Sequence, residues 1–287
     1  MKKPLAASNL LFLLLCSMYA CKKEAPATEQ PYLFEPTPLS WPIEPTISGT
    51  SGLADSKTCA EHLWVQEDGG SPTQLILLGY NGQIKRKMFL KGVVNRDWEE
   101  LQAAGKDLFI ADIGDNKQTH KTYTIYQFQE PSLDVDTVTD IRKIEFMYPD
   151  GSHDAEAFIV DPITKEIFIL TKRDNPSRIY KLPVPFSYTS LNKAIYVGNL
   201  PYNGVVGAAL SANGKEILLK TYTNIFYYTR PDDQPLLNAL QKEGKILTYQ
   251  VEPQGEAVAF TNSNSGFYTL SEQNSSSQAS LYFYRRK

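Results

Sequence analysis

The sequence predicts an all-β fold, a β-propeller of five four-stranded blades, with a six-bladed ring as the alternative count. An internal repeat carries this prediction, because five similar segments begin 47 to 57 residues apart, at positions 50, 97, 154, 206 and 254. That period suits a four-stranded blade with variable loops. The 17 Tyr, 13 Phe, 17 Gly and 18 Pro residues favour short strands joined by turns. Tandem hairpins in a β-sandwich are the competing fold.

Composition also limits the function. The chain has 287 residues, of which 42% are hydrophobic and 21% charged, and this is enough for a large core. The formal net charge is −3, and no dense basic stripe follows the extreme N-terminus. Proteins that bind nucleic acid carry such a stripe, so we exclude this class.

Residues 1–20 have the features of a signal peptide. Lys2 and Lys3 precede the apolar run Leu10–Leu15, which is too short to span a bilayer, and Ala20 stands directly before Cys21. A membrane-anchor helix is the alternative interpretation. The pair Ala20–Cys21 resembles the lipobox of bacterial lipoproteins, which implies that Cys21 receives a lipid. We therefore expect a protein of the bacterial cell envelope, anchored to the outer membrane on its periplasmic or its surface face.

A tether is expected at residues 21–38, followed by one propeller domain at residues 39–287. The segment after Cys21 is rich in proline, a composition typical of extended, semi-rigid spacers. If Cys21 is lipidated and Cys16 is removed, Cys59 is the one cysteine left in the domain. We expect it to be a buried thiol with no disulfide partner.

Each repeat contains further strands in the order that a blade requires. Second strands are expected at 63–65, 108–110, 167–170, 217–219 and 267–270, and third strands at 74–78, 123–128, 178–182, 224–228 and 281–284. Fourth strands are expected at 84–89, 141–148, 193–197 and 245–250, but the fifth repeat ends without one. Leu39–Ile43 can supply that strand and so close the ring. Residues 236–242 have the apolar spacing of one short helix.

The first strands bring candidate functional residues together. In a propeller these strands line the central channel, and equivalent residues of successive blades face one another. Glu99, Glu156 and Glu256 are equivalent in their repeats, and Asp97 and Asp154 stand two residues before the first two of them. Their carboxylates should therefore converge near one end of the channel.

The same end of the channel should collect other polar groups. Gly52 and Ala208 take the place of the glutamates in the other two repeats, so the acidic ring is incomplete. The ends of the second strands add candidate ligand-binding side chains at Asp112, Thr171, Lys172, Lys220, Tyr222 and Glu272.

Converging carboxylates repel one another unless a cation, a proton or a basic side chain neutralises them. Oxygen ligands of this kind suit calcium, and no His/Cys cluster suited to zinc accompanies them. We expect Glu99, Glu156 and Glu256 to be metal ligands, with calcium as the candidate cofactor. In the alternative, Lys172, Lys220 and Arg173 pair with the carboxylates and no metal binds.

His153 is the one candidate for a catalytic residue. It precedes Asp154 and could act as a general base at neutral pH, or it could be an exposed histidine beside a Gly–Ser turn. Ser51 lacks the nucleophile-elbow pattern, so a serine hydrolase is not indicated.

Several motifs together resemble a family of uncharacterised bacterial lipoprotein propellers. They are Asp97-Trp98-Glu99, Asp112-Ile113-Gly114-Asp115-Asn116, Tyr148-Pro149-Asp150-Gly151, Asp154-Ala155-Glu156-Ala157 and Thr171-Lys172, and the resemblance covers residues 48–284. No activity comes with this resemblance. The Glu–Ala starts are more distantly similar to those of phytase-like and lactonase-like propellers, which implies calcium and hydrolysis of a phosphate ester or a lactone.

The leading functional hypothesis is a lipid-anchored envelope propeller that binds a small-molecule or protein ligand at an acidic channel mouth, with calcium as the bridging ion. A metal-dependent hydrolase of phosphate esters or lactones is the first alternative. A structural or protein-interaction propeller, whose channel is closed by salt bridges, is the second.

Overall fold

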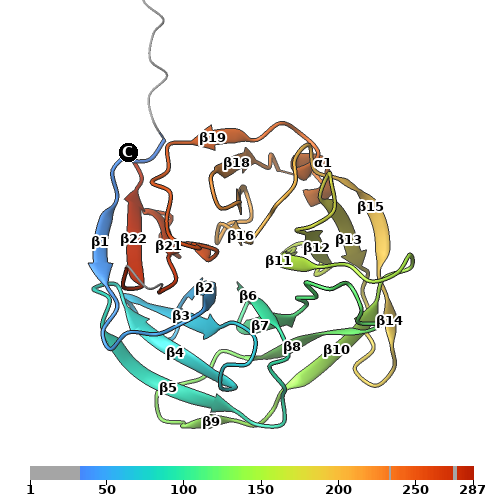
Figure 1. The fold of residues 1–287 in the computed structure, drawn as a ribbon, viewed down its shortest axis with the longest axis horizontal. Coiled ribbons are helices and arrows are strands. Elements are labelled where there is room, and N and C mark those ends of the chain that lie inside the picture. Colours follow the sequence, from blue (N-terminus) through green and yellow to red (C-terminus); the bar gives the residue numbers. More distant parts are fainter. Residues whose placement is uncertain (1–32, 233, 274–276) are drawn as a thin grey trace, which may run out of the picture. The chain divides into compact units, whose positions relative to one another are not determined.

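Five mainly antiparallel sheets form a ring around a central axis (Figure 1). The computed structural model describes residues 33–232, 234–273 and 277–287. Each sheet is one blade, with its first strand nearest the axis and later strands further out. The fold is a five-bladed β-propeller, so the predicted fold class and blade count are confirmed.

The blades follow one another along the chain. Blade 1 contains β2 (Thr50–Asp55), β3 (His62–Glu67), β4 (Gln74–Gly79) and β5 (Ile84–Leu90), and blade 2 contains β6 (Trp98–Ala104), β7 (Asp107–Asp112), β8 (Tyr123–Gln129) and β10 (Arg142–Met147). Blade 3 contains β11 (Ala155–Val160), β12 (Ile167–Thr171), β13 (Arg178–Leu182) and β15 (Ile195–Asn199). Blade 4 contains β16 (Gly207–Leu210), β17 (Glu216–Lys220), β18 (Ile225–Thr229) and β19 (Lys245–Leu247).

Blade 5 joins the two ends of the described chain. It contains β20 (Val258–Phe260), β21 (Gly266–Leu270), β22 (Ser280–Arg285) and, as its outermost strand, β1 (Leu39–Pro42). β1 pairs antiparallel with β22, which confirms the predicted ring closure. Phe34, within the predicted tether, is buried against Tyr227 and Phe267.

Two short strands extend blades 1 and 2 beyond the predicted four. β9 (Thr137–Val138) pairs parallel with β5, and β14 (Asn192–Lys193) pairs parallel with β10. Each covers an outer strand that would otherwise expose unpaired backbone groups. The predicted strand 193–197 is corrected accordingly, because Lys193 belongs to β14 of blade 2 and only β15 belongs to blade 3.

The helix and the last strand of blade 4 are shorter than predicted. α1 spans Leu236–Leu240, and its apolar residues pack against blades 3 and 4. β19 ends at Leu247, three residues before the predicted end. Within the described residues, no helix is long and apolar enough to cross a membrane.

The core consists of five apolar clusters, one between each pair of neighbouring blades. Tyrosines of the third strands contribute much of it. Tyr123, Tyr126, Tyr180, Tyr227, Tyr228 and Tyr284 are buried. Cys59 is also buried and has no disulfide.

Polar side chains block the middle of the channel. Glu100 Oε2 accepts a hydrogen bond from Ala208 N at 2.8 Å, and Gln102 Nε2 donates one to Ala208 O at 2.6 Å. These bonds join β6 to β16, strands of non-adjacent blades. The two ends of the channel are therefore separate sites.

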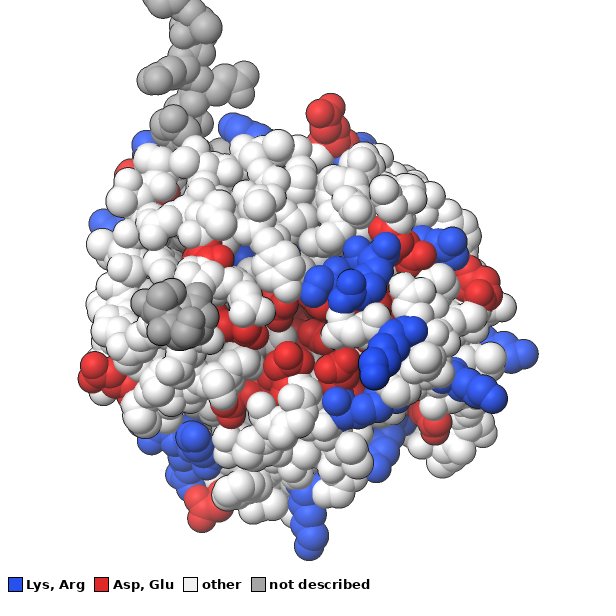
Figure 2. Space-filling model, in the orientation of Figure 1, with Lys and Arg blue, Asp and Glu red and all other residues white. Residues whose placement is uncertain are grey.

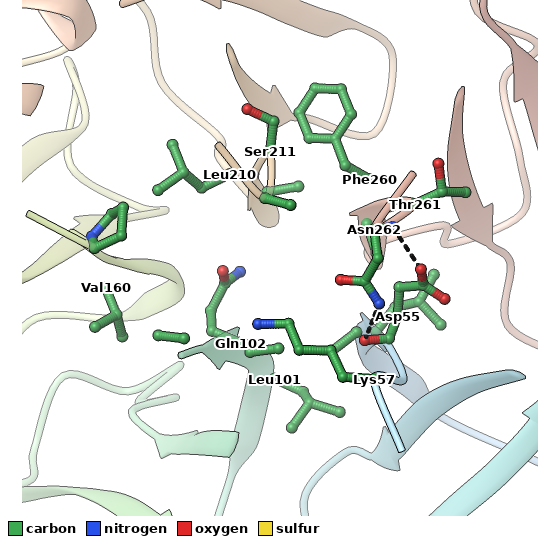
Figure 3. A pocket seen from close by; sticks show the side chains of 18 of the residues that line it. Asp55, Lys57, Leu101, Gln102, Val160, Leu210, Ser211, Phe260, Thr261 and Asn262 are labelled. Carbon is green, nitrogen blue, oxygen red and sulfur yellow. Dashed lines mark hydrogen bonds between the residues drawn. The ribbon is translucent and has the colours of Figure 1, made fainter. Parts of the chain in front are cut away.

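The end of the channel at which β6 terminates forms a pocket of about 70 Å³ (Figure 3). Lys57 lies across it and donates to Gly105 O at 2.6 Å, while Asn262 is bonded to Asp55 through its backbone N at 2.6 Å. Its other lining residues are mostly apolar, among them Leu101, Leu210 and Phe260.

Candidate functional site

The opposite end of the channel begins with a backbone irregularity that three blades share. β2, β6 and β11 each carry a β-bulge, at Ser51, Glu99 and Glu156 respectively. A bulge adds one residue to a strand and redirects its side chain. The three side chains therefore lie at the same level of three successive blades and point in the same direction relative to their strands.

The strand register corrects the predicted equivalence of the repeats in blades 1 and 4. Counted from the turn, Ala157 and Gly207 are equivalent, and β16 pairs with β17 without a bulge, so Glu156 has no counterpart in blade 4. By the same comparison, Ser51 rather than Gly52 is the counterpart in blade 1. The sequence missed Ser51 because a bulge shifts the register without leaving a signal in residue type.

The structure brings Glu99, Glu156 and Glu256 together. One carboxylate oxygen of each lies within 4.8 Å of the other two, and all three residues are buried. Asp68, Asp97 and Glu99 form a second group with the same spacing. We call these residues and Glu272 the acidic mouth, and Figure 2 shows acidic side chains gathered at the centre of this face.

One ammonium group lies within the acidic mouth. Lys172 Nζ forms an ion pair with Glu156 and lies 3.9 Å from Glu256 Oε1. It also donates to Tyr222 OH at 3.1 Å, and Tyr222 OH donates to Glu256 Oε1 at 2.6 Å. Ser51 Oγ donates to Glu256 Oε2 at 2.9 Å. Part of the cluster is thus neutralised internally, as the salt-bridge alternative expects.

The second acidic group depends on glycines. A Cβ atom at Gly114 would overlap Glu99 Oε1 and Asp97 Oδ2, and one at Gly69 would overlap Asp97 Oδ1. Glycine at both positions lets the carboxylates lie against the backbone.

For Asp68, Asp97, Glu99 and Glu272, no ion pair is present among the described residues.

Burial, and then repulsion between neighbouring carboxylates, raises several carboxyl pKa values in the acidic mouth. Burial, followed by repulsion from Asp68 and Asp154, raises the pKa of Asp97 to about 6. Burial, followed by Glu256 and Asp68, raises the pKa of Glu272 to about 7. The pKa of Glu99 is also raised, first by burial and then by Glu156. The cluster therefore retains protons at a pH where isolated carboxyl groups have lost them.

These shifts predict how stability depends on pH. Asp97 and Glu272 have pKa values of 3.8 and 4.5 in an unfolded chain and about 6 and about 7 when folded. Between these limits the folded state binds more protons, so we expect the free energy of unfolding in chelator to fall as pH rises from about 4.5 to about 7. The pKa values of Asp115 and Asp161 are lowered in the folded chain, so these two groups change the free energy of unfolding only below this pH range.

Urea unfolding at several pH values, with a metal chelator present, measures this dependence. The variant D97N/E272Q should lose much of the decline, whereas D134N/D136N, at carboxyl groups far out on blade 1, should keep it. A D97N/E272Q profile as steep as that of the unaltered chain would contradict the prediction.

Other predicted site residues lie beside the mouth and have structural partners. Asp112 Oδ1 accepts from Asp97 N at 2.8 Å, and Asp154 Oδ1 accepts from Asp115 N at 2.8 Å. Thr171 Oγ1 accepts from Arg178 N at 2.8 Å within blade 3.

Lys220 is fully buried and does not reach the acidic mouth. Its ammonium donates to Gly255 O and lies 3.7 Å from Glu252 Oε2. Lys220 therefore connects blades 4 and 5 and is not accessible to a ligand.

His153 is buried, so the expectation of an exposed histidine is wrong. Its Nδ1 lies 2.9 Å from Asp174 Oδ2, and its Nε2 lies 2.9 Å from Tyr180 OH and 3.2 Å from Asp150 Oδ1. Both ring nitrogens already have partners. This arrangement holds the segment before β11 in place and leaves no nitrogen free for a substrate.

No protein-family model matches the sequence, and no curated protein sequence is similar to it. Similar solved structures include hydrazine synthase from Kuenenia stuttgartiensis, with a TM-score of 0.45 and 9% identity over 83% of this chain and 71% of that one. An auxiliary nutrient-binding protein from Bacteroides thetaiotaomicron has a TM-score of 0.48 and 7% identity, over 88% of this chain and 73% of that one. Similarity at this level carries no inference about ligand or activity, and the resemblances to lipoprotein and calcium-dependent propellers stay predictions.

Proposed function

We propose that this chain is a lipid-anchored β-propeller of the bacterial cell envelope that binds a ligand at the acidic mouth through a divalent cation, calcium in the first instance. The signal-like segment and Ala20–Cys21 support the anchor. Partition into a detergent phase that the substitution C21S abolishes would test it.

The convergence of three glutamates from three blades carries the proposal. Glu156 Oε2 is buried and has no hydrogen-bond partner within the described chain, although its Oε1 pairs with Lys172. A buried carboxylate oxygen without a partner is costly, and a bound cation would satisfy it.

The donor set favours a hard cation. The groups nearest one another are carboxylates of Glu99, Glu156, Glu256, Asp68 and Asp97, with no His or Cys among them. Calcium takes six to eight oxygen ligands in flexible geometry. The two clusters of carboxylates have Glu99 in common, and together they can supply several of these oxygen atoms. Carboxylates that do not coordinate the cation would then bind basic or hydroxyl groups of the ligand.

Thermal unfolding with chelator and with calcium tests the proposal. A cation that binds only the folded state at about 100 times its Kd adds about 2.7 kcal/mol of stability. For a domain of this size we expect the Tm to rise by roughly 5–10 °C. The variant E99Q/E156Q/E256Q should lose this rise, because an amide oxygen carries no charge.

The matched control is E61Q/E145Q/E243Q, at exposed glutamates, which should keep the full rise. No calcium-dependent rise in the unaltered chain would overturn the cation and favour a structural or protein-interaction propeller. Chelator-sensitive turnover of phosphate esters or lactones would instead identify a hydrolase, with a base other than the fully bonded His153.

A further inference from the structure

A second hollow lies between blades 2 and 3, at the channel end opposite the acidic mouth. It has a volume of about 400 Å³, within the usual range for small-molecule sites. Its walls are the β6–β7 turn, the start of β7, the end of β8, the end of β11 with the β11–β12 turn, and the loop after β13. Ala104, Gly105 and Val160 separate it from the pocket of Figure 3, whose wall they also form. We call this hollow the interblade pocket.

The floor of the interblade pocket is apolar. Phe109 and Val160 are buried there, and Phe186 packs against the same core cluster. At the rim, Val184 is 44% exposed and Tyr188 is 40% exposed. An apolar ligand would remove these two side chains from water, and each Å² of apolar surface buried stabilises the complex by about 25 cal/mol.

Polar groups in the wall bond to one another and fix its shape. Tyr188 OH donates to Gln127 Oε1 at 3.0 Å, and Gln127 Nε2 donates to Asp107 Oδ2 at 2.6 Å. Arg142 lies 3.6 Å from Asp107 Oδ2 and 5.0 Å from the Tyr188 ring centre. The one carboxylate in the wall is therefore already paired, and the Tyr188 ring is held in a set orientation.

Positive charge remains at the rim. Lys165 Nζ donates to Pro162 O at 2.7 Å, and the ammonium keeps further protons to donate. Lys106 is exposed, and its ammonium has no hydrogen bond or ion pair within the described residues. An apolar floor beneath two ammonium groups complements a molecule with an apolar body and an anionic head.

We propose that the interblade pocket binds a small amphipathic carboxylate, with its hydrocarbon part over Phe109 and Phe186 and its carboxylate at Lys106 and Lys165. None of the residues that line the interblade pocket belongs to the acidic mouth. Its occupation is thus independent of a cation.

Calorimetric titration of the purified chain with decanoate, in chelator, tests this proposal. We expect one decanoate per chain, bound about tenfold more tightly than decan-1-ol, which lacks the charge. V184D places a carboxylate at the apolar rim and should reduce decanoate affinity more than tenfold. K106E/K165E should abolish the preference for decanoate over the alcohol.

Matched controls distinguish the pocket from general adsorption. I246D alters another exposed apolar residue, on blade 4, and K91E reverses an exposed lysine on blade 1, so both should bind decanoate unchanged. Equal binding of acid and alcohol, or undiminished binding by V184D, would overturn the proposal. A chain dimer that V184D dissociates would also overturn it, by making a second copy the occupant.

Discussion

The variant K220M should unfold more easily than the unaltered chain by about 3–5 kcal/mol, the usual cost of removing one partner from a buried ion pair. Lys220 and Glu252 are both inaccessible to solvent, with Lys220 Nζ 3.7 Å from Glu252 Oε2. Methionine fills a similar volume but leaves the Glu252 charge without its counter-ion. Urea unfolding at neutral pH measures the loss.

A double variant separates charge from packing. K220M/E252Q removes both charges, so we expect it to be more stable than K220M although it carries more changes. The control K215M, at a half-exposed lysine that pairs on the surface with Asp232, should change stability by less than about 1 kcal/mol. A loss for K220M as small as that for K215M would contradict the buried-pair assignment.

Lys220 also links stability to the candidate site. Its ammonium donates to the carbonyl of Gly255, the residue before Glu256. A Cβ atom at Gly255 would collide with Glu252, so the chain must approach this pair closely here. The backbone that presents Glu256 to the acidic mouth therefore rests on the buried pair.

The ring and its acidic mouth could be predicted because they depend on repetition. First strands occupy equivalent places around one axis, so the repeat alone indicates that Glu99, Glu156 and Glu256 lie at one level on three different blades. The turn residues and strand lengths indicated the order of strands within each blade. Ring closure by β1 followed from the missing fourth strand of blade 5.

Single-residue placement could not be predicted in the same way. A bulge or its absence shifts the register by one position, and in a strand that shift moves a side chain to the other face. Lys172 and Lys220 stand at the ends of equivalent strands, yet one enters the acidic mouth and the other is buried between blades. His153 is buried because Asp174 and Tyr180, which lie in other parts of blade 3, contact its ring. The spacing of these residues in the sequence does not reveal the contacts.

The variant E130A should lose a similar amount of stability, about 3–5 kcal/mol, although Glu130 forms no ion pair among the described residues. Its Oε1 atom is close to donors of four other residues, namely Ser56 Oγ at 2.7 Å, Lys57 N at 2.9 Å, Thr58 N at 3.1 Å, Thr58 Oγ1 at 3.0 Å and Trp64 Nε1 at 2.8 Å. Alanine leaves these donors without an acceptor, and each unsatisfied buried group costs about 1–3 kcal/mol, less than additively.

E130Q tests whether negative charge matters, since its amide oxygen still accepts but its NH₂ group faces donors. We expect E130Q to lie between E130A and the unaltered chain in urea unfolding, because hydrogen bonds to a charged acceptor are about twice as strong as neutral ones. E145A, at an exposed glutamate on β10, should be nearly neutral. If E130A were as stable as E145A, the loop 56–59 would have another source of order. A loss shared by E130A and E130Q would show that this carboxylate, rather than apolar packing alone, holds the β2–β3 loop against blade 2.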